Sequence, residues 1–229
     1  MRYYPVNLDI QNKNCLVIGG GGVAERKIKT LIKCGALVTA VSIKASDSVK
    51  TLAKLHKINL KIKKYETSDL TNMFLVIGAT NNNRINSEIS KDAKKLKVIC
   101  NIADYPKKCD FILPAIVKRG DLVISVSTSG KSPALAKKIK KELEKSFGEE
   151  YAKTLDIMGF IRKILLNKAH EPEEHKSVFE KLINLQLCKA IKKKNVNAVK
   201  TIICEALGDK YSNEASLCDK TLIKNILEH

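Results

Sequence analysis

A run of glycines between a predicted strand and a predicted helix constrains the fold of this chain more than any other feature. Asn14 to Ile18 is a short run of strand-forming residues, and apolar residues recur at helical spacing from Val23 to Cys34. The intervening residues form G-x-G-x-x-A from Gly19 to Ala24. In this context the backbone N–H groups at the helix N-terminus bind the pyrophosphate of a dinucleotide. The pattern therefore predicts a βαβ opening that binds such a cofactor.

The same alternation of strands and helices continues through the first half of the chain. Segments with helical character, Ser46 to Leu55 and Ile85 to Ala93, separate further short apolar runs. These runs are Leu37 to Ile43, Leu60 to Ile62, Met73 to Ile77 and Val98 to Cys100. Alternation of this kind is typical of an α/β fold, here a Rossmann-type parallel sheet with helices on both faces.

The pattern changes after Pro114. Ala115 to Val117 and Leu122 to Val126 flank a plausible hairpin turn, and Ser132-Pro133 begins a lysine-rich helix that reaches about Phe147. About four helices follow, with breaks near Glu171-Pro172, Lys194-Asn195 and Gly208 to Asn213. We predict a nucleotide-binding domain over residues 1–113, a small region over 114–150 and a helical C-terminal domain over 151–229.

Composition excludes several classes of protein. A net charge of +18 attracts polyanions, but the lysines are dispersed, tryptophan is absent and no reading motif accompanies them, so we expect no nucleic-acid partner. No apolar run could span a membrane and the N-terminus lacks a signal peptide, which predicts a cytoplasmic protein that does not bind membranes. The seven cysteines form no CxxC, so we expect reduced thiols and no metal site.

The cofactor is predicted to be NAD, with NADP less favoured. The second strand ends in Val41-Ser42-Ile43-Lys44, without the acid that usually holds the adenosine ribose. Ser42 or backbone groups would replace that acid, whereas Lys44 could favour a 2′-phosphate. Thr80 and Asn81 follow the fourth strand and could contact the nicotinamide, although Asn81 to Asn83 could instead cap the next helix. The predicted cofactor contacts are Gly19, Gly21, Gly22, Val23, Ser42, Ile43, Lys44, Thr80 and Asn81.

Several unusual strings in series resemble one family across roughly residues 1 to 150. They are GGGGVAER from Gly19, GATN from Gly78, CNIADYP from Cys100, FILP from Phe111 and SVSTSGKSPALA from Ser125. Their order and spacing resemble the precorrin-2 dehydrogenase/sirohydrochlorin ferrochelatase family. The resemblance implies a Rossmann-type domain, a dimerisation region at 114–150 and a helical tail, with two chains intertwined as a homodimer and the active site between the domains. It also implies oxidation of precorrin-2, a tetrapyrrole, to sirohydrochlorin with NAD; some members also insert ferrous iron as a second substrate.

The resemblance assigns the catalytic role to Asp104 in the CNIADYP string, where a carboxylate can accept a proton from the macrocycle as general base. Asp110 is the less favoured alternative. The hydroxyl-rich stretch before the Ser132 helix suits a substrate carboxylate, although helix capping is an equally good explanation. Thr128 stands where related chains carry serine, which argues against a role that needs a primary hydroxyl. The predicted substrate contacts are Asn101, Ser127, Thr128, Ser129, Lys131 and Ser132.

The leading alternative from another functional class is a nucleotide-sensing Rossmann regulatory module without catalysis. Such modules usually keep the ribose-binding acid that Val41 to Lys44 lacks, and they need neither Asp104 in its setting nor the hydroxyl-rich stretch. Failure to oxidise precorrin-2 would favour this alternative.

Overall fold

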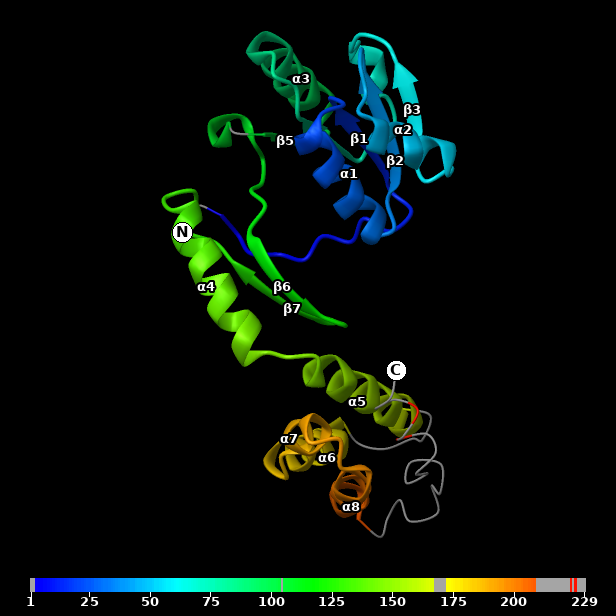
Figure 1. Cartoon of the computed structure of the whole chain (residues 1–229), viewed down its shortest axis with the longest axis vertical. Helices are drawn as coiled ribbons and strands as arrows, with labels where there is room; N and C mark the ends of the chain where they lie inside the picture. Colours follow the sequence, from blue (N-terminus) through cyan, green and yellow to red (C-terminus); the bar gives the residue numbers. More distant parts are fainter. Residues whose placement is uncertain (1–2, 104, 167–171, 209–222, 224, 226–229) are drawn as a thin grey trace. The chain divides into compact units, whose positions relative to one another are not determined.

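The chain divides into two compact units, Met1–Leu113 and Pro114–His229. The computed structural model in Figure 1 describes residues 3–103, 105–166, 172–208, 223 and 225. Each unit is described by itself below. The further division of the second unit at residue 150 stays a prediction.

The first unit contains a five-stranded parallel sheet. Its strands are β1 (Asn14–Ile18), β2 (Leu37–Ser42), β3 (Asn59–Ile62), β4 (Leu75–Gly78) and β5 (Ile99–Ile102). They lie in the order β3-β2-β1-β4-β5, and every neighbouring pair is parallel. The strand order reverses between β1 and β4, where ligands of such folds bind at the carboxyl ends of the strands. The predicted Rossmann-type sheet is confirmed.

Helices cover both faces of this sheet because its central strands are apolar on both sides. Cys15 and Val17 of β1 pack with α1 (Gly22–Lys33) and α2 (Asp47–Lys54), whereas Leu16 and Ile18 pack with α3 (Asn83–Leu96). A 3₁₀ turn, η1 (Thr67–Leu70), joins the α3 side through Leu70. These layers bury both faces of the sheet, so we expect the binding site at the carboxyl ends of its strands.

The helices that begin at this edge start in different ways. Ser46 caps α2 by accepting from the Val49 N–H, and Asn82 caps α3 by accepting from the Arg84 and Ile85 N–H groups. Gly21 stands at the same position before α1 and provides no side-chain cap. The N–H groups in the first turn of a helix have no partner within the helix. Among α1, α2 and α3, it is therefore the first-turn N–H groups of α1 that have no side-chain cap and can bind a ligand.

The second unit begins with a hairpin and a helix that packs on it. β6 (Ala115–Arg119) and β7 (Leu122–Val126) pair antiparallel across Gly120-Asp121, where Gly120 has φ 55°. α4 (Pro133–Ser146) packs against β6 and β7. Its N-cap, Ser132, accepts a hydrogen bond from the Leu135 N–H. The predicted hairpin and the predicted helix start are both confirmed.

Among the residues described after position 149, four helices share a core: α5 (Glu150–Leu166), α6 (Pro172–Asn184), α7 (Leu187–Lys192) and α8 (Val196–Leu207). The predicted helical region is confirmed. The sequence interpretation missed the break between α6 and α7, where Gln186 adopts a left-handed conformation with φ 63°. None of the described helices is long and apolar enough to cross a membrane.

The cysteines correct one expectation. Cys15, Cys34, Cys100, Cys109 and Cys188 are free thiols, as expected. Cys204 of α8 is disulfide-bonded, so the expectation that every cysteine is reduced is wrong at this position. Spacing along the chain does not reveal which thiols meet in space, so this bond could not be predicted from sequence.

Candidate nucleotide-binding and active site

The inner half of the glycine turn is packed against the protein. Gly19 has φ 128°, and a Cβ atom there would overlap the Ala79 carbonyl at the end of β4. A Cβ at Gly20 would overlap the Lys44 carbonyl and lie 2.8 Å from the Ser42 hydroxyl. These two positions need glycine because the loops after β2 and β4 leave no room for a side chain.

The outer half of the turn faces open space. A Cβ at Gly21 or Gly22 would meet nothing within 4 Å. The first turn of α1 begins here without a side-chain cap, so its N–H groups point outward beside two residues that have no side chains. This geometry fits the pyrophosphate of a dinucleotide, which needs close approach to the backbone.

The loop after β2 is tied to the glycine turn. The Ser46 N–H donates to the Gly20 carbonyl over 2.8 Å, and the Ser42 hydroxyl donates to the Lys44 carbonyl over 2.8 Å. Ile43 and Lys44 are exposed. The Ser42 oxygen keeps accepting capacity, whereas its proton is engaged within the loop. Of the predicted adenosine contacts, Ser42 is therefore held in place and Lys44 is a surface cation.

The loop after β4 is organised by a buried amide. The Thr80 hydroxyl donates to Asn86 Oδ1 over 2.7 Å, and Asn86 Nδ2 donates to the Thr80 carbonyl over 2.9 Å. Asn82 caps α3, so one of the three consecutive asparagines has the capping role considered from sequence. Asn81 is exposed beside it. The Thr80 side chain thus serves the loop itself, and of these two predicted contacts Asn81 is the one whose side chain is exposed.

Side-chain hydrogen bonds shape the segment after β5. Asn101 is buried and donates from Nδ2 to the Phe111 carbonyl over 2.9 Å. The Cys109 sulfur accepts from the Ile102 N–H over 3.1 Å and lies 3.2 Å from the Tyr105 carbonyl. These contacts fold the chain back on both sides of position 104. Asp104 itself, the predicted catalytic residue, lies outside the described residues.

The other carboxylate of this segment has a structural partner. Asp110 Oδ2 accepts from the Cys100 N–H over 2.9 Å, and the Asp110 N–H donates to the Cys100 carbonyl over 2.9 Å. Burial raises the pKa of the Cys100 thiol to about 12, and the charge of Asp110 adds to that rise. Asp110 therefore holds the carboxyl end of β5 in place.

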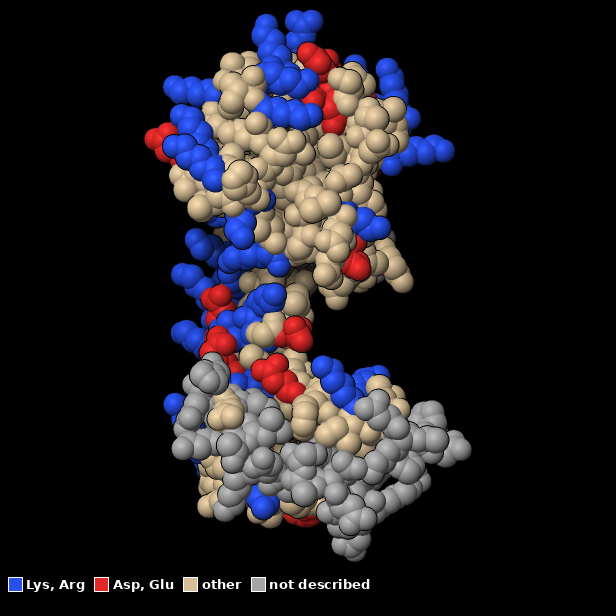
Figure 2. All heavy atoms as spheres, turned by 90° about the vertical axis from the view of Figure 1, so that its right-hand side faces the viewer, with Lys and Arg blue, Asp and Glu red and all other residues tan. Residues whose placement is uncertain are grey.

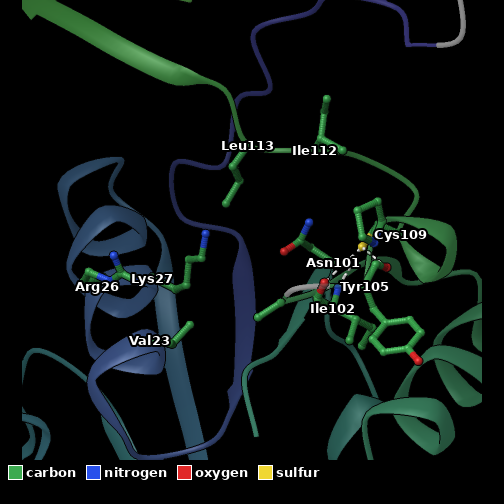
Figure 3. Close-up of a pocket in the computed structure, with 11 residues that line it drawn as sticks. Val23, Arg26, Lys27, Asn101, Ile102, Tyr105, Cys109, Ile112 and Leu113 are labelled. Atoms are coloured by element: carbon green, nitrogen blue, oxygen red, sulfur yellow. Dashed lines mark hydrogen bonds between the residues drawn. The ribbon is translucent and has the colours of Figure 1, made fainter. Parts of the chain in front are cut away.

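A cavity of about 210 Å³ lies between α1 and the segment after β5 (Figure 3). Val23, Arg26 and Lys27 of α1 line one side. Asn101, Tyr105 and Cys109 line the other, together with Ile112 and Leu113. Sequence reasoning named Val23 and Asn101 but missed Arg26 and Lys27. Their spacing from Val23, three and four residues, places all three on one helix face and could have found them.

In the second unit, the hydroxyl-rich stretch closes into a tight loop. The Ser132 N–H donates to the Thr128 hydroxyl over 3.1 Å, and that hydroxyl donates to the Ser132 carbonyl over 3.0 Å. The Ser129 N–H donates to the Ser127 hydroxyl over 3.1 Å. Ser129 and Lys131 are exposed. Helix capping, considered as an alternative from sequence, is the role of Ser132, whereas Thr128 braces the loop and Lys131 offers a charge.

Basic residues outnumber acidic ones in this chain, 42 to 24. Figure 2 shows lysine and arginine side chains spread over the face that it draws, in keeping with the net charge of +18. In the part of the chain that the structure describes, no three His, Cys, Asp or Glu side chains group so as to hold a metal ion.

Comparison with known proteins finds two family models and a solved structure that resemble this chain. Residues 6–115 match the family model described as putative NAD(P)-binding, and residues 119–146 match the one described as sirohaem biosynthesis protein central. The solved structure of SirC, precorrin-2 dehydrogenase, superposes with a TM-score of 0.70 and 26% identity over 87% of this chain and 98% of that one. The chain is therefore similar to SirC over nearly the whole length of that protein.

Curated relatives of this SirC-like chain are longer proteins. The siroheme synthase of Ruthia magnifica subsp. Calyptogena magnifica is 35% identical over 181 residues, which make up 79% of this chain and 38% of the relative. The siroheme synthase of Pseudoalteromonas atlantica is 38% identical over 144 residues, 63% of this chain and 31% of the relative. The SirC-like chain thus spans about two fifths of the length of the first of these relatives.

Proposed function

We propose that this chain is a precorrin-2 dehydrogenase, which oxidises precorrin-2 to sirohydrochlorin in siroheme biosynthesis. The observation that carries the proposal is the match to SirC, precorrin-2 dehydrogenase, over 98% of that chain, together with an NAD(P)-binding match over residues 6–115. The open outer half of the glycine turn supports it, because this surface fits a dinucleotide.

The cofactor would be NAD rather than NADP. The nicotinamide ring, when bound, accepts a hydride from the substrate. The N–H groups of the first turn of α1 would hold the pyrophosphate beside Gly21 and Gly22, and Ser42 would accept a hydrogen bond from the adenosine ribose. Ile43 would pack beneath the adenine and Asn81 would lie on the nicotinamide side. Lys44 is exposed and is the residue that would approach a 2′-phosphate if the cofactor were NADP.

Asp104 would take the proton. Oxidation of precorrin-2 removes one hydride and one proton, so the chain must supply a base for the proton. A carboxylate within hydrogen-bond reach of the substrate can accept that proton. Its neighbours Ala103 and Tyr105 belong to the segment held by the Cys109 thiol. Asn101 would help to orient the substrate, because its Oδ1 remains after Nδ2 has bonded Phe111.

The second unit would contribute to substrate binding in a homodimer. Ser127, Ser129, Lys131 and the Thr128–Ser132 loop present hydroxyls, N–H groups and one ammonium to a tetrapyrrole that carries many carboxylates. Residues 114–150 would form the dimerisation region. If ferrous iron is a second substrate, the macrocycle would supply its nitrogen ligands and Asp104 would take up displaced pyrrole protons.

An anaerobic assay of the purified chain tests the proposal. Precorrin-2 is mixed with NAD or with NADP, and the absorbance of the reduced cofactor and of sirohydrochlorin is followed; ferrous iron is added afterwards. We expect sirohydrochlorin to form with NAD faster than with NADP. Iron incorporation above the rate without protein would reveal chelatase activity.

The same assay decides against the proposal if neither cofactor supports oxidation. Retained binding of NADH in that case would favour a nucleotide-sensing regulatory module, since the glycine turn would still function without the chemistry. Oxidation at a higher rate with NADP would leave the dehydrogenase in place and reverse the cofactor preference.

A further inference from the structure

A buried amide on α3 is bonded to the loop that follows β4. Asn86 lies near the start of α3 and is 4% exposed. Its Oδ1 accepts from the Thr80 hydroxyl over 2.7 Å, and its Nδ2 donates to the Thr80 carbonyl over 2.9 Å. We infer that Asn86 is a positioning residue, which holds this loop in the conformation that binds the nicotinamide half of the dinucleotide. The inference rests on the cofactor assignment of the proposed function and adds a residue that acts through Thr80.

Asn86 is too deeply buried to contact a ligand itself. Burying a polar side chain costs free energy unless its hydrogen bonds are made within the protein. Ile89 and Ala93, three and seven residues further along α3, lie on the same helix face and belong to the core. An apolar residue at position 86 would continue that face without such a cost. The amide at this position therefore serves to hold Thr80.

The hydrogen bonds continue from Thr80 across the loop. The Asn82 N–H donates to the Thr80 hydroxyl over 3.2 Å, and the Asn82 side chain caps α3. Asn81 lies between these two residues and is exposed. The backbone is thus fixed on both sides of Asn81, and the first of these two fixed points depends on Asn86.

This loop lies on one side of the glycine turn, and the loop after β2 lies on the other, since the strands are ordered β2-β1-β4. The Ala79 N–H donates to the Ile18 carbonyl over 2.8 Å, directly before the turn. The loop after β2 is bonded to Gly20 through the Ser46 N–H and does not involve Asn86. A dinucleotide that crosses the turn places its two halves on opposite sides. A change at Asn86 should therefore affect the nicotinamide half and spare the adenosine half.

Two ligands that share the adenosine half test the inference. NADH carries the nicotinamide, whereas ADP-ribose lacks it and keeps the adenosine and the pyrophosphate. Both are titrated by isothermal calorimetry into wild type, N86L and N86D. Leucine resembles asparagine in shape but has no polar atoms, so N86L loses both bonds to Thr80. Aspartate keeps the acceptor for the Thr80 hydroxyl and loses the donor to the Thr80 carbonyl.

Asp92 provides the matched control on the same helix. It is 8% exposed, and its Oδ2 accepts from the Tyr65 hydroxyl over 3.1 Å and from the Thr67 hydroxyl over 2.8 Å. D92L therefore also removes two buried side-chain hydrogen bonds of α3, but these reach the segment before β4 and not the loop after it. Urea denaturation of every variant shows how much stability each substitution costs.

Wild type should bind NADH more tightly than ADP-ribose. We expect N86L to weaken NADH binding about tenfold and ADP-ribose binding less than about twofold, because the loop must then be ordered when the nicotinamide binds. N86D should show a smaller loss that is again specific to NADH. D92L should lower the urea midpoint but keep both affinities within about twofold of wild type.

Four outcomes overturn the inference. The first is an equal loss of both ligands in N86L, and the second is a loss in D92L as large as that in N86L. The third is wild-type NADH affinity in the asparagine variants; if N86L does not fold, N86D decides this point. The fourth is equal affinity of wild type for NADH and ADP-ribose, since the nicotinamide would then make no net contact.

These measurements need no turnover, which separates the inference from the proposed function. If wild type does not oxidise precorrin-2, the proposed function fails, and the two affinities still decide the role of Asn86. If wild type oxidises precorrin-2 and N86L and N86D bind NADH as wild type does, only the role of Asn86 fails.

Discussion

The turn after β1 and the segment after β5 lie at the same edge of one sheet but are built on opposite principles. The first is shaped by the absence of side chains: Gly19 and Gly20 are pressed against neighbouring carbonyls, and Gly21 and Gly22 face open space. The second is shaped by side chains, namely the Asn101 amide, the Cys109 thiol and the Asp110 carboxylate, which bond the backbone. The first region suits binding of a common cofactor, and the second suits chemistry particular to one substrate.

The largest effect is expected at the β5 segment, from Asp104→Asn. Loss of the general base should lower kcat by about 10²–10⁴-fold and leave NADH affinity unchanged, because the glycine turn is intact. Asp110→Asn is the matched control, since that carboxylate bonds the Cys100 N–H and should cost only about 1 kcal/mol of stability. Rapid turnover by Asp104→Asn would show that the segment after β5 does not supply the catalytic base, and the contrast with the β1 turn would fail.

Within the β1 turn, Gly19→Ala should harm the fold itself. The new methyl group would overlap the Ala79 carbonyl, and φ of 128° is unfavourable for alanine. We expect a loss of about 2–4 kcal/mol in the free energy of unfolding, measured by urea denaturation followed by circular dichroism. Gly22→Ala is the control. A Cβ at Gly22 meets nothing within 4 Å, so this variant should keep the free energy of unfolding of the wild-type protein. Equal stability of the two variants would contradict the packed inner half.

Gly21→Val should separate binding from folding. Nothing lies within 4 Å of a Cβ at this position, so the fold should remain while the isopropyl group blocks the approach of the pyrophosphate. NADH should bind at least about tenfold more weakly, a free energy of about 1.4 kcal/mol, and the unfolding midpoint without cofactor should stay unchanged. Wild-type NADH affinity would show that the dinucleotide does not contact this part of the turn.

The smallest expected effect is on the free energy of unfolding, and it is expected only at alkaline pH. Burial raises the pKa of Cys15 in β1 to about 11 and that of Cys100 in β5 to about 12, from 9.0. Above pH 9.0 the unfolded chain releases these protons before the folded chain does, so stability should fall from there toward pH 12. Denaturation in this range, compared between wild type and Asp110→Asn, should show a shallower fall in the variant, because Asp110 contributes to the Cys100 shift. An equal slope would exclude that contribution.

The parts of the fold that sequence could predict are those set by local patterns. The strand from Asn14 to Ile18 is predicted at its observed bounds, because an apolar run followed by glycines leaves few alternatives. The helix start at Ser132-Pro133 is equally local. The break at Gln186 is not, since a left-handed glutamine carries no glycine or proline signal. The disulfide bond at Cys204 depends on which thiols meet in the folded chain, which periodicity cannot reveal.

The candidate site divides in the same way. The glycine pattern predicts an open approach to the backbone at Gly21, and the structure has it. The inward bonding of the Thr80 hydroxyl depends on Asn86, one helical turn into α3, and sequence spacing gives no reason to pair them. Arg26 belongs to the recognised string from Gly19, yet its place in the cavity emerges only when β5 and the segment after it close the other wall.

The loop between β2 and α2 has a consequence for protein engineering. Its two ends are fixed, by the bond from the Ser46 N–H to the Gly20 carbonyl and by that from the Ser42 hydroxyl to the Lys44 carbonyl. Between them the side chains of Ile43, 69% exposed, and Lys44 protrude from the surface. Residues 43 and 44 are therefore suitable positions for mutagenesis. Libraries of side chains there could change the preference for one nucleotide over another, while the two hydrogen bonds keep the loop conformation.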